Sequence, residues 1–440
     1  MKKVVIIGAS VGGLVAAAKL KKAGVNVTIL EKGNSVGGLF SKVSTPFGVY
    51  ELGMHVLYVT EEQHALISEM FGSDAFIAKT GFETDIGGCF NNGTLYTNSI
   101  YPDVRALPSR DLIYSQILKR GTACKTVSAT DELQQRFGVE AAQNVVAPIL
   151  QKLWGKETDE LSSEAIHCFF DLRRIVLADK PESDKLKSNP VLDSVLGNPV
   201  QAQPAGDVFG GRKALFFKNG IHGFSERILN YLKEKEINIF LGSDVQLINN
   251  KLVSNSSPLI ESYDACILAS PLNALDKSLF NVLDSIELSI FYYKVRLRPQ
   301  NRTPVYYVLC HSEKLISSRI VDYSAYNFDH VTHLDQVLAV EVLHEVGKRP
   351  DEKIIGLELA QVLPNIEIIE GFTYPHSLRI ASPTLHNSRI LDEKINLLKQ
   401  NFRNDSLYFV GMRTDKGVFF SHQTIGAAYE AALECIERFS

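Results

Sequence analysis

The sequence predicts an α/β protein in which a parallel-sheet domain is interrupted by a second domain with an antiparallel sheet and a helical cap. Residues 3–7 form a short apolar run rich in β-branched side chains, and a glycine-rich turn, a helical pattern and a second apolar run at 25–30 follow. Such continuous runs are typical of strands buried on both faces of a parallel sheet. We therefore expect one strand–turn–helix–strand unit at the start of the chain.

The first half of the chain supplies the next elements in order. Alternation around a turn predicts a hairpin within residues 40–57, and the helical character of residues 111–177 predicts a helical cap. Residues 177–211 carry four prolines among scattered polar residues, which predicts a long irregular connection or lid.

The second half returns to the parallel sheet. An amphipathic helix is expected at residues 224–233, and strands are expected at 237–241, 265–268 and 406–410. Alternating apolar residues predict an antiparallel sheet that forms the floor of the substrate domain, from residues 288–309, 319–323 and 337–342. A last helix is expected at residues 426–439.

The order of these elements implies a discontinuous domain arrangement, which the length of 440 residues can accommodate. Residues 1–90, 205–285 and 395–440 are expected to form the nucleotide-binding domain. Residues 91–204 and 286–394 are expected to form the substrate and cap domain.

Composition narrows the class of function. The formal net charge of −4 and the lack of a dense basic run argue against a nucleic-acid partner, which leaves a small-molecule substrate. No run of about twenty apolar residues predicts a membrane-spanning helix, although peripheral membrane contact stays open. The six cysteines are widely spaced without metal-ligand spacing, so we expect reduced thiols, no metal site and a cytoplasmic protein.

The turn after the first strand contains Gly8, Ser10, Gly12 and Gly13. Binding a dinucleotide requires a turn tight enough to bring a pyrophosphate close to backbone amides at a helix N-terminus, where the helix dipole favours negative charge. Ser10 replaces the middle glycine of the usual G-x-G-x-x-G pattern with a small side chain. These four residues are therefore candidate pyrophosphate-binding positions.

An acidic residue, Glu31, ends the second strand eighteen residues after Gly13, and Lys32 follows it. A carboxylate at this position accepts hydrogen bonds from ribose hydroxyls and disfavours a ribose 2′-phosphate. Both residues are candidate cofactor contacts, and the turn and strand leave FAD and NAD as alternatives.

The residues after Glu31 carry a resemblance to a known superfamily. Paired glycines and an acidic-x-Gly step follow, at Gly37, Gly38, Glu51 and Gly53. This pattern resembles the flavoprotein superfamily of amine oxidases, protoporphyrinogen oxidase, phytoene-type desaturases and UDP-galactopyranose mutase. The resemblance implies FAD as the cofactor and an FAD-dependent oxidoreductase in which an organic substrate gives hydride to flavin.

The resemblance also implies further cofactor positions along the chain. Leu39 follows the paired glycines, Val245 corresponds to the backbone segment that contacts adenine, and Gly411 ends the C-terminal strand that binds flavin. Gly426 is expected to present free amides at the start of the last helix. Arg413 stands near the family's usual acidic residue and would contact phosphate or substrate, or lie at the surface.

Some fragments resemble UDP-galactopyranose mutase in particular, and they keep a non-redox flavoenzyme acting on a nucleotide sugar as the alternative. They are residues 53–55, residues 152–155 and residues 318–322. In this comparison the expected arginine near residue 168 is absent, and the nearest, Arg173 and Arg174, are out of register. A further alternative is a protein that binds FAD without turnover.

Two residues are the candidate catalytic groups. His55 would donate to a flavin or substrate oxygen and shuttle a proton, or else cap a turn. Arg319 would hold a carboxylate or diphosphate, or else pair with a neighbour such as Asp322. Trp154 would line the substrate cavity or anchor the cap, and Lys294 would border the flavin or lie exposed on its strand.

Overall fold

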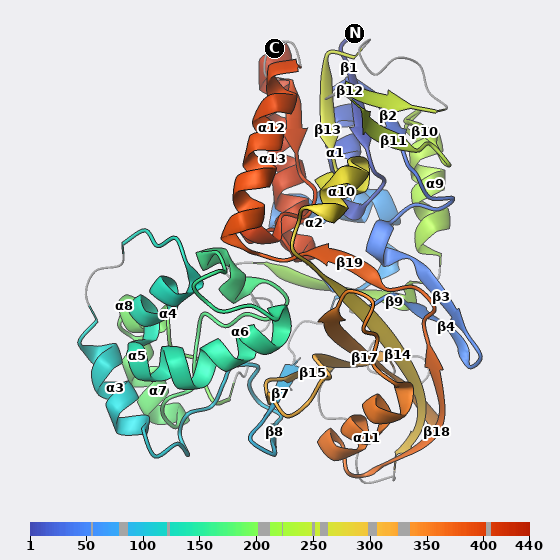
Figure 1. Cartoon of the computed structure of the whole chain (residues 1–440). Helices are drawn as coiled ribbons and strands as arrows, with labels where there is room; N and C mark the ends of the chain where they lie inside the picture. Colours follow the sequence, from blue (N-terminus) through green and yellow to red (C-terminus); the bar gives the residue numbers. More distant parts are fainter. Residues whose placement is uncertain are drawn as a thin grey trace.

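The structure is a computed structural model, and it describes residues 1–53, 56–78, 87–120, 124–200, 212–221, 223–248, 251–255, 263–297, 306–323, 335–401 and 406–440. A sheet with helices on its faces lies at the end of the molecule that carries both termini, and a second sheet and a group of short helices lie at the other end (Figure 1). The predicted fold class, a Rossmann-like unit joined to an α+β region, is confirmed.

The first sheet is entirely parallel in its pairings. Its strand order is β10 (Asn238–Phe240), β2 (Asn26–Leu30), β1 (Lys3–Ile7), β13 (Ala265–Leu268) and β20 (Leu407–Phe409). Strands from the start, the middle and the end of the chain therefore meet in one sheet, as the sequence predicts.

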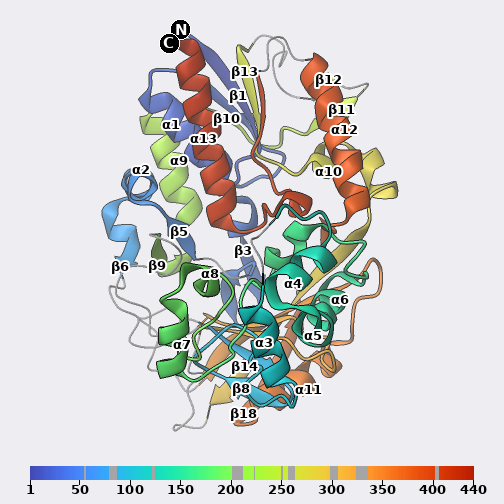
Figure 2. The ribbon, with the colours of Figure 1, turned by 90° about the vertical axis from the view of Figure 1, so that its left-hand side faces the viewer.

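Successive strand residues point to opposite sides of the sheet, and here both sides carry apolar side chains. Both faces are therefore covered by other elements. Val4 and Ile6 pack with α1 (Val11–Lys22), α2 (Glu61–Phe71), α9 (Phe224–Glu234) and α13 (Ser421–Phe439). Val5 and Ile7 pack with the other layer, which contains α10 (Leu272–Leu275), α12 (Leu385–Asn401), β11 (Val245–Ile248) and β12 (Lys251–Ser254). Figure 2 shows α12 and α13 on opposite sides of the sheet.

The second large sheet is antiparallel except where β15 pairs with β7. Its order is β18 (Ile366–Thr373), β14 (Ser285–Leu297), β17 (Asp335–Glu345), β16 (Arg319–Asp322), β15 (Tyr307–Cys310), β7 (Gly87–Asn91) and β8 (Thr94–Tyr96), and β19 (Leu378–Ala381) also pairs with β14. The predicted antiparallel sheet is confirmed. α11 (Glu352–Val362) packs on one face and the cap on the other.

Smaller pairings connect the two large sheets. The predicted hairpin is present as β3 (Lys42–Thr45) and β4 (Gly48–Glu51). A three-stranded sheet follows, in the order β5 (Leu57–Val59), β9 (Lys213–Ile221) and β6 (Phe76–Ala78).

The cap is helical, as predicted. It contains α3 (Arg110–Leu118), α4 (Ala129–Phe137), α5 (Val139–Ala141) and α6 (Ala147–Trp154), followed by α7 (Lys180–Lys187) and α8 (Pro190–Asp193). The prediction of irregular structure throughout residues 177–211 is therefore wrong for its first part. Pro181 and Pro190 lie in the first turns of α7 and α8, where proline's fixed φ favours a helix and its missing N–H costs no intrahelical hydrogen bond.

The last helix begins at Ser421, five residues before the predicted start. Gly426 misled the prediction because glycine is common at helix ends, whereas here it lies inside the second turn. Within the described part of the chain, none of the helices has the length and apolar character needed to cross a bilayer. All six cysteines are free thiols.

Candidate functional site

The glycine turn between β1 and α1 is packed so closely that side chains would not fit. A Cβ on Gly13 would lie 2.2 Å from the Gly8 carbonyl oxygen, and a Cβ on Gly8 would lie 2.4 Å from Ser270 Oγ. Ser10 caps α1, because its Oγ accepts a hydrogen bond from the Gly13 amide and donates one to the Ala269 carbonyl. The first-turn amides of α1 have no acceptors within the helix, so this cradle fits a pyrophosphate group.

Gly12 serves the packing of two helices. A Cβ there would meet the Thr424 carbonyl oxygen at 3.1 Å and the Ala428 side chain at 3.5 Å, so its lack of a side chain lets α13 approach α1. The N-terminal part of α13 is thereby held against the pyrophosphate turn. Gly426 contributes no such contact, since nothing lies within 4 Å of its Cβ position.

Glu31 lies directly beside the turn. Its carboxylate accepts hydrogen bonds from the amides of Ala9 at 2.6 Å and Gly33 at 2.7 Å. Each carboxylate oxygen has a second lone pair, so the group keeps capacity for ribose hydroxyls. The Ser243 amide donates to the Glu31 carbonyl at 2.8 Å, which brings the segment leading to the buried Val245 next to it.

Lys32 and the paired glycines line the same region. Lys32 is exposed, and its Nζ is 3.6 Å from Oδ1 of the partly buried Asp244. Gly37 has a φ of 111° and its amide donates to the Ala9 carbonyl, while a Cβ on Gly38 would come within 3.4 Å of Ser10. Leu39 is 52% exposed.

The C-terminal candidates separate into two groups. Gly411 packs tightly, with a Cβ position 2.4 Å from the Ser270 carbonyl oxygen, so it joins the turn at the carboxyl ends of β1, β13 and β20. Arg413 is engaged in ion pairs within the protein. Its guanidinium binds both oxygens of the buried Asp415 and also Asp392, so the expected phosphate or substrate contact is replaced by a structural ion pair.

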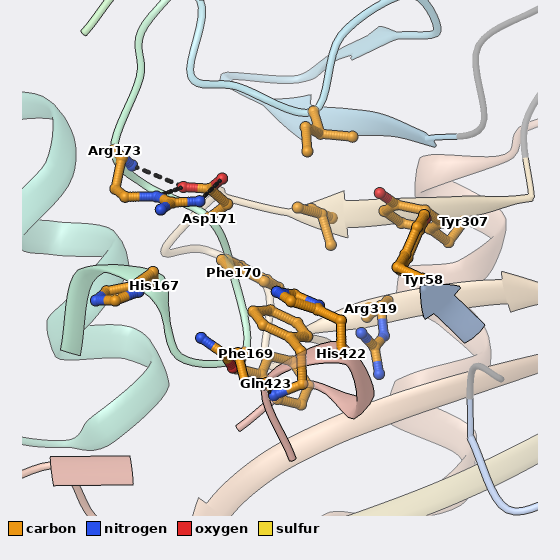
Figure 3. Close-up of a pocket in the computed structure, with 13 residues that line it drawn as sticks. Tyr58, His167, Phe169, Phe170, Asp171, Arg173, Tyr307, Arg319, His422 and Gln423 are labelled. Atoms are coloured by element: carbon orange, nitrogen blue, oxygen red, sulfur yellow. Dashed lines mark hydrogen bonds and ion pairs between the residues drawn. The ribbon is translucent and has the colours of Figure 1, made fainter. Parts of the chain in front are cut away.

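A pocket lies between the cap, the second sheet and the start of α13 (Figure 3). Its cavity volume is about 90 Å³, and the 650 Å³ of empty space around it includes open solvent. Its lining residues are Tyr58, Ile100, His167, Phe169, Phe170, Asp171, Arg173, Tyr307, Leu309, Arg319, Phe420, His422 and Gln423. The pocket thus combines an aromatic wall with a few polar and charged groups, as substrate sites commonly do.

Arg319 is one of these charged groups. It lies on β16 opposite Glu341 of β17 and donates to Glu341 Oε2, so the neighbour that pairs with it is Glu341 and not Asp322. Its guanidinium also lies over the Phe169 ring, 4.9 Å from the centroid. Phe169 has a φ of 68°, a conformation that costs a bulky residue about 1–3 kcal/mol and concentrates at functional sites.

A second arginine in the pocket, Arg173, pairs with the carboxylate of Asp171. Arg173 binds Asp171 through two hydrogen bonds, of 2.8 and 2.7 Å, shown as dashed lines in Figure 3. Burial alone would raise the pKa of Asp171, but the Arg173 guanidinium more than offsets it and lowers that pKa. His422 is kept neutral, since burial first and the nearby Arg212 and Arg173 second lower its pKa to about 4.

The other sequence candidates lie elsewhere. His55 is outside the described residues. Lys294 is 3.4 Å from Asp335, away from the pocket lining, and Trp154 is buried at 1% exposure in the cap core and does not line the pocket. Lys152 bonds the carbonyls of Cys310, Ser312 and Ser317, which fastens α6 to the loop before β16.

Sequence reasoning did not single out most of the pocket lining. Arg173 was considered only as an arginine out of register, and His422 follows two phenylalanines without any local motif. The residues come from β5, the cap, β15, β16 and α13, so no spacing in the chain brings them together. Among the described residues no cluster of three or more His, Cys, Asp or Glu could hold a metal ion.

Comparison with known proteins agrees with this geometry at the level of fold. The pattern of the NAD(P)-binding Rossmann-like domain matches residues 6–72. Protoporphyrinogen oxidase 2 of Arabidopsis thaliana is 23% identical over 298 residues, which cover 62% of this chain and 58% of that protein. Phytoene desaturase of Fusarium fujikuroi is 38% identical over 69 residues, 16% of this chain and 12% of that one. The chain matches less than two thirds of the length of these relatives.

Solved structures match the chain over its whole length. Reduced UDP-galactopyranose mutase superposes with a TM-score of 0.69 at 16% identity, covering 100% of this chain and 96% of that one. A putative protoporphyrinogen oxidase from Exiguobacterium sp. 255-15 gives 0.61 at 14% identity, with coverage of 100% and 98%. The chain has the fold of the amine oxidase and protoporphyrinogen oxidase-like superfamily, so the predicted resemblance is confirmed.

Proposed function

We propose that this chain is an FAD-dependent oxidoreductase of the amine oxidase and protoporphyrinogen oxidase-like type, in which an organic substrate transfers hydride to the flavin. The observation that carries the proposal is that α13 joins two sites: Gly12 holds it against the pyrophosphate turn, and its first residues line the pocket. FAD, when bound, would supply the hydride acceptor.

The residues of this chain would divide the work of binding. The amides around Gly8 to Gly13 would hold the pyrophosphate and Glu31 the ribose, while Lys32, Gly37, Gly38, Leu39, Val245 and Gly411 would complete the cofactor site. Gly426 would act only through the backbone of α13. These assignments keep FAD in preference to NAD, because the paired glycines after Glu31 belong to the pattern that resembles flavoproteins.

In the pocket, the phenylalanines would enclose the substrate and exclude water, which strengthens the polar contacts inside. Arg319 and Gln423 would orient polar groups of the substrate, and His55 would exchange a proton with it. A small organic substrate with both apolar and polar parts fits this lining. Protoporphyrinogen and putrescine, which occur in the names of a relative and of a structural neighbour, are the first substrates to screen.

The non-redox reaction of a nucleotide sugar remains the second candidate, because Arg173 and Arg319 line one pocket and could together hold a diphosphate. Each guanidinium is already bound by a carboxylate, Asp171 or Glu341, so the pocket offers little net positive charge. This pairing favours the oxidoreductase.

The division into domains is proposed along the predicted segments, with residues 1–90, 205–285 and 395–440 binding FAD and the rest binding substrate. β7 begins at Gly87 and pairs with β15, which argues for moving the first boundary a few residues toward the N-terminus. We also propose a cytoplasmic location, which the six free thiols support.

The test is spectroscopic. Purified protein should carry or take up FAD and show the yellow colour of oxidised flavin, and anaerobic addition of the right amine, porphyrinogen or related substrate should bleach it. Protein that stays colourless with added FAD contradicts the proposal. A yellow protein that no substrate bleaches, but that interconverts UDP-sugars only after dithionite reduction, would instead support the mutase-like reaction.

A further inference from the structure

Glu341 is a completely buried carboxylate whose hydrogen-bonding capacity is only half used. The residue is 0% exposed, and its Oε2 accepts from Arg319. Its Oε1 is buried and has no partner among the described residues, and the same is true of Arg319 Nε. Two polar atoms of one ion pair therefore lack partners in the interior.

The unpartnered oxygen lies close to Gly53. A Cβ on Gly53 would lie 3.1 Å from Glu341 Oε1, so only glycine leaves this space open. The hydroxyls of Tyr292 and Tyr323 donate to the Glu51 carbonyl at 2.7 and 2.9 Å, which holds the backbone just before Gly53 in place. Ser421, the first residue of α13, donates to the Val56 carbonyl at 3.1 Å.

Glu341 lies between Gly53 on one side and Arg319, a pocket residue, on the other. The residues around Gly53 carry the resemblance to segments beside the flavin, and the start of α13 lines the pocket with Arg319. Leaving a charged atom buried without a partner costs several kcal/mol, so such atoms in native proteins usually meet a ligand or a functional demand. A bound molecule beside Gly53 would meet that demand.

We propose that Glu341 sets the reduction potential of the flavin bound beside Gly53, with Arg319 offsetting part of its charge. The inference rests on the proposed function. A negative charge near the ring opposes the arrival of electrons, and the low dielectric constant of the interior makes this effect long-ranged. A hydrogen-bond donor on the ring facing Oε1 would use the free lone pairs.

The experiment compares three variants of the full FAD-loaded chain without any substrate. Reduction potentials are measured by stepwise dithionite reduction against reference dyes. Glu341→Gln removes the negative charge and should shift the potential to more positive values. Arg319→Gln leaves the carboxylate uncompensated and should shift it to more negative values.

Glu345→Gln is the matched control. Glu345 lies on the same strand, β17, but its side chain is 69% exposed and paired with Lys348, so its potential should equal that of the wild type. A general disturbance of the fold would not move the potentials of Glu341→Gln and Arg319→Gln in opposite directions.

Equal potentials in all variants, or shifts of the same sign in Glu341→Gln and Arg319→Gln, overturn the inference. If Glu341→Gln does not fold, the Arg319→Gln shift decides alone, and a positive shift or none counts against it. A wild-type protein that takes up no FAD overturns the proposed function as well, so the two failures are distinguishable.

Discussion

Gly13→Ala should disrupt cofactor binding while a glycine substitution in another helix should not. A Cβ on Gly13 would lie 2.2 Å from the Gly8 carbonyl oxygen and 3.0 Å from the Ala269 side chain. The turn must open by roughly 1 Å to accept it, and overpacking of this kind costs about 1–3 kcal/mol. If that cost falls on the binding-competent turn, FAD affinity decreases roughly 5- to 150-fold, because 1.4 kcal/mol corresponds to a factor of ten.

Gly426→Ala is the control, since nothing lies within 4 Å of the new methyl group and the residue is inside α13. Alanine in a helix interior stabilises by about 1 kcal/mol relative to glycine. FAD affinity is measured by fluorescence quenching, and unfolding free energy by denaturant titration. The reasoning is refuted if Gly13→Ala keeps wild-type affinity, or if Gly426→Ala loses it.

Three other perturbations test the electrostatics of the fold and the site. Arg413→Met leaves the buried Asp415 carboxylate unpaired, so the unfolding free energy in denaturant should fall by about 3–5 kcal/mol; a loss below about 1 kcal/mol would contradict this. Glu31→Gln removes a charged ribose acceptor, so FAD titrations should give weaker binding, and unchanged affinity would count against its role. Burial first lowers the pKa of His311 to about 3 and of His422 to about 4, from the usual 6.5. The unfolded chain therefore binds protons that the folded chain does not, and stability should fall as pH decreases from 6.5 toward 4. Replacing His311 by Phe should flatten that dependence in denaturant titrations at several pH values.

Local sequence signals were sufficient for the nucleotide unit. β1, α1 and β2 appear where the apolar runs and the glycine turn predict them, because each signal acts over a few neighbouring residues. The same holds for the hairpin β3–β4 and for α9. Prediction failed at Pro181 and Gly426, where one residue type has two common uses and the neighbouring packing selects between them.

Partner choice could not be read from the sequence in the same way. The alternative to ligand binding by Arg319 was a pair with Asp322, three residues along its own strand, but side chains on a strand meet those of the adjacent strand. The register of β16 against β17 places Glu341 opposite it. Arg413 similarly pairs with Asp392, which lies on α12.

The sequence by itself determined the pyrophosphate turn, the acidic end of β2 and the class of fold, since these depend on backbone conformation and on the period of apolar residues. Only the tertiary structure decided which side chains form the pocket, because they come from five separate parts of the chain. A short-range pattern fixes the backbone locally. Which groups share a cavity, and which charges neutralise one another there, depends on how distant strands and helices pack.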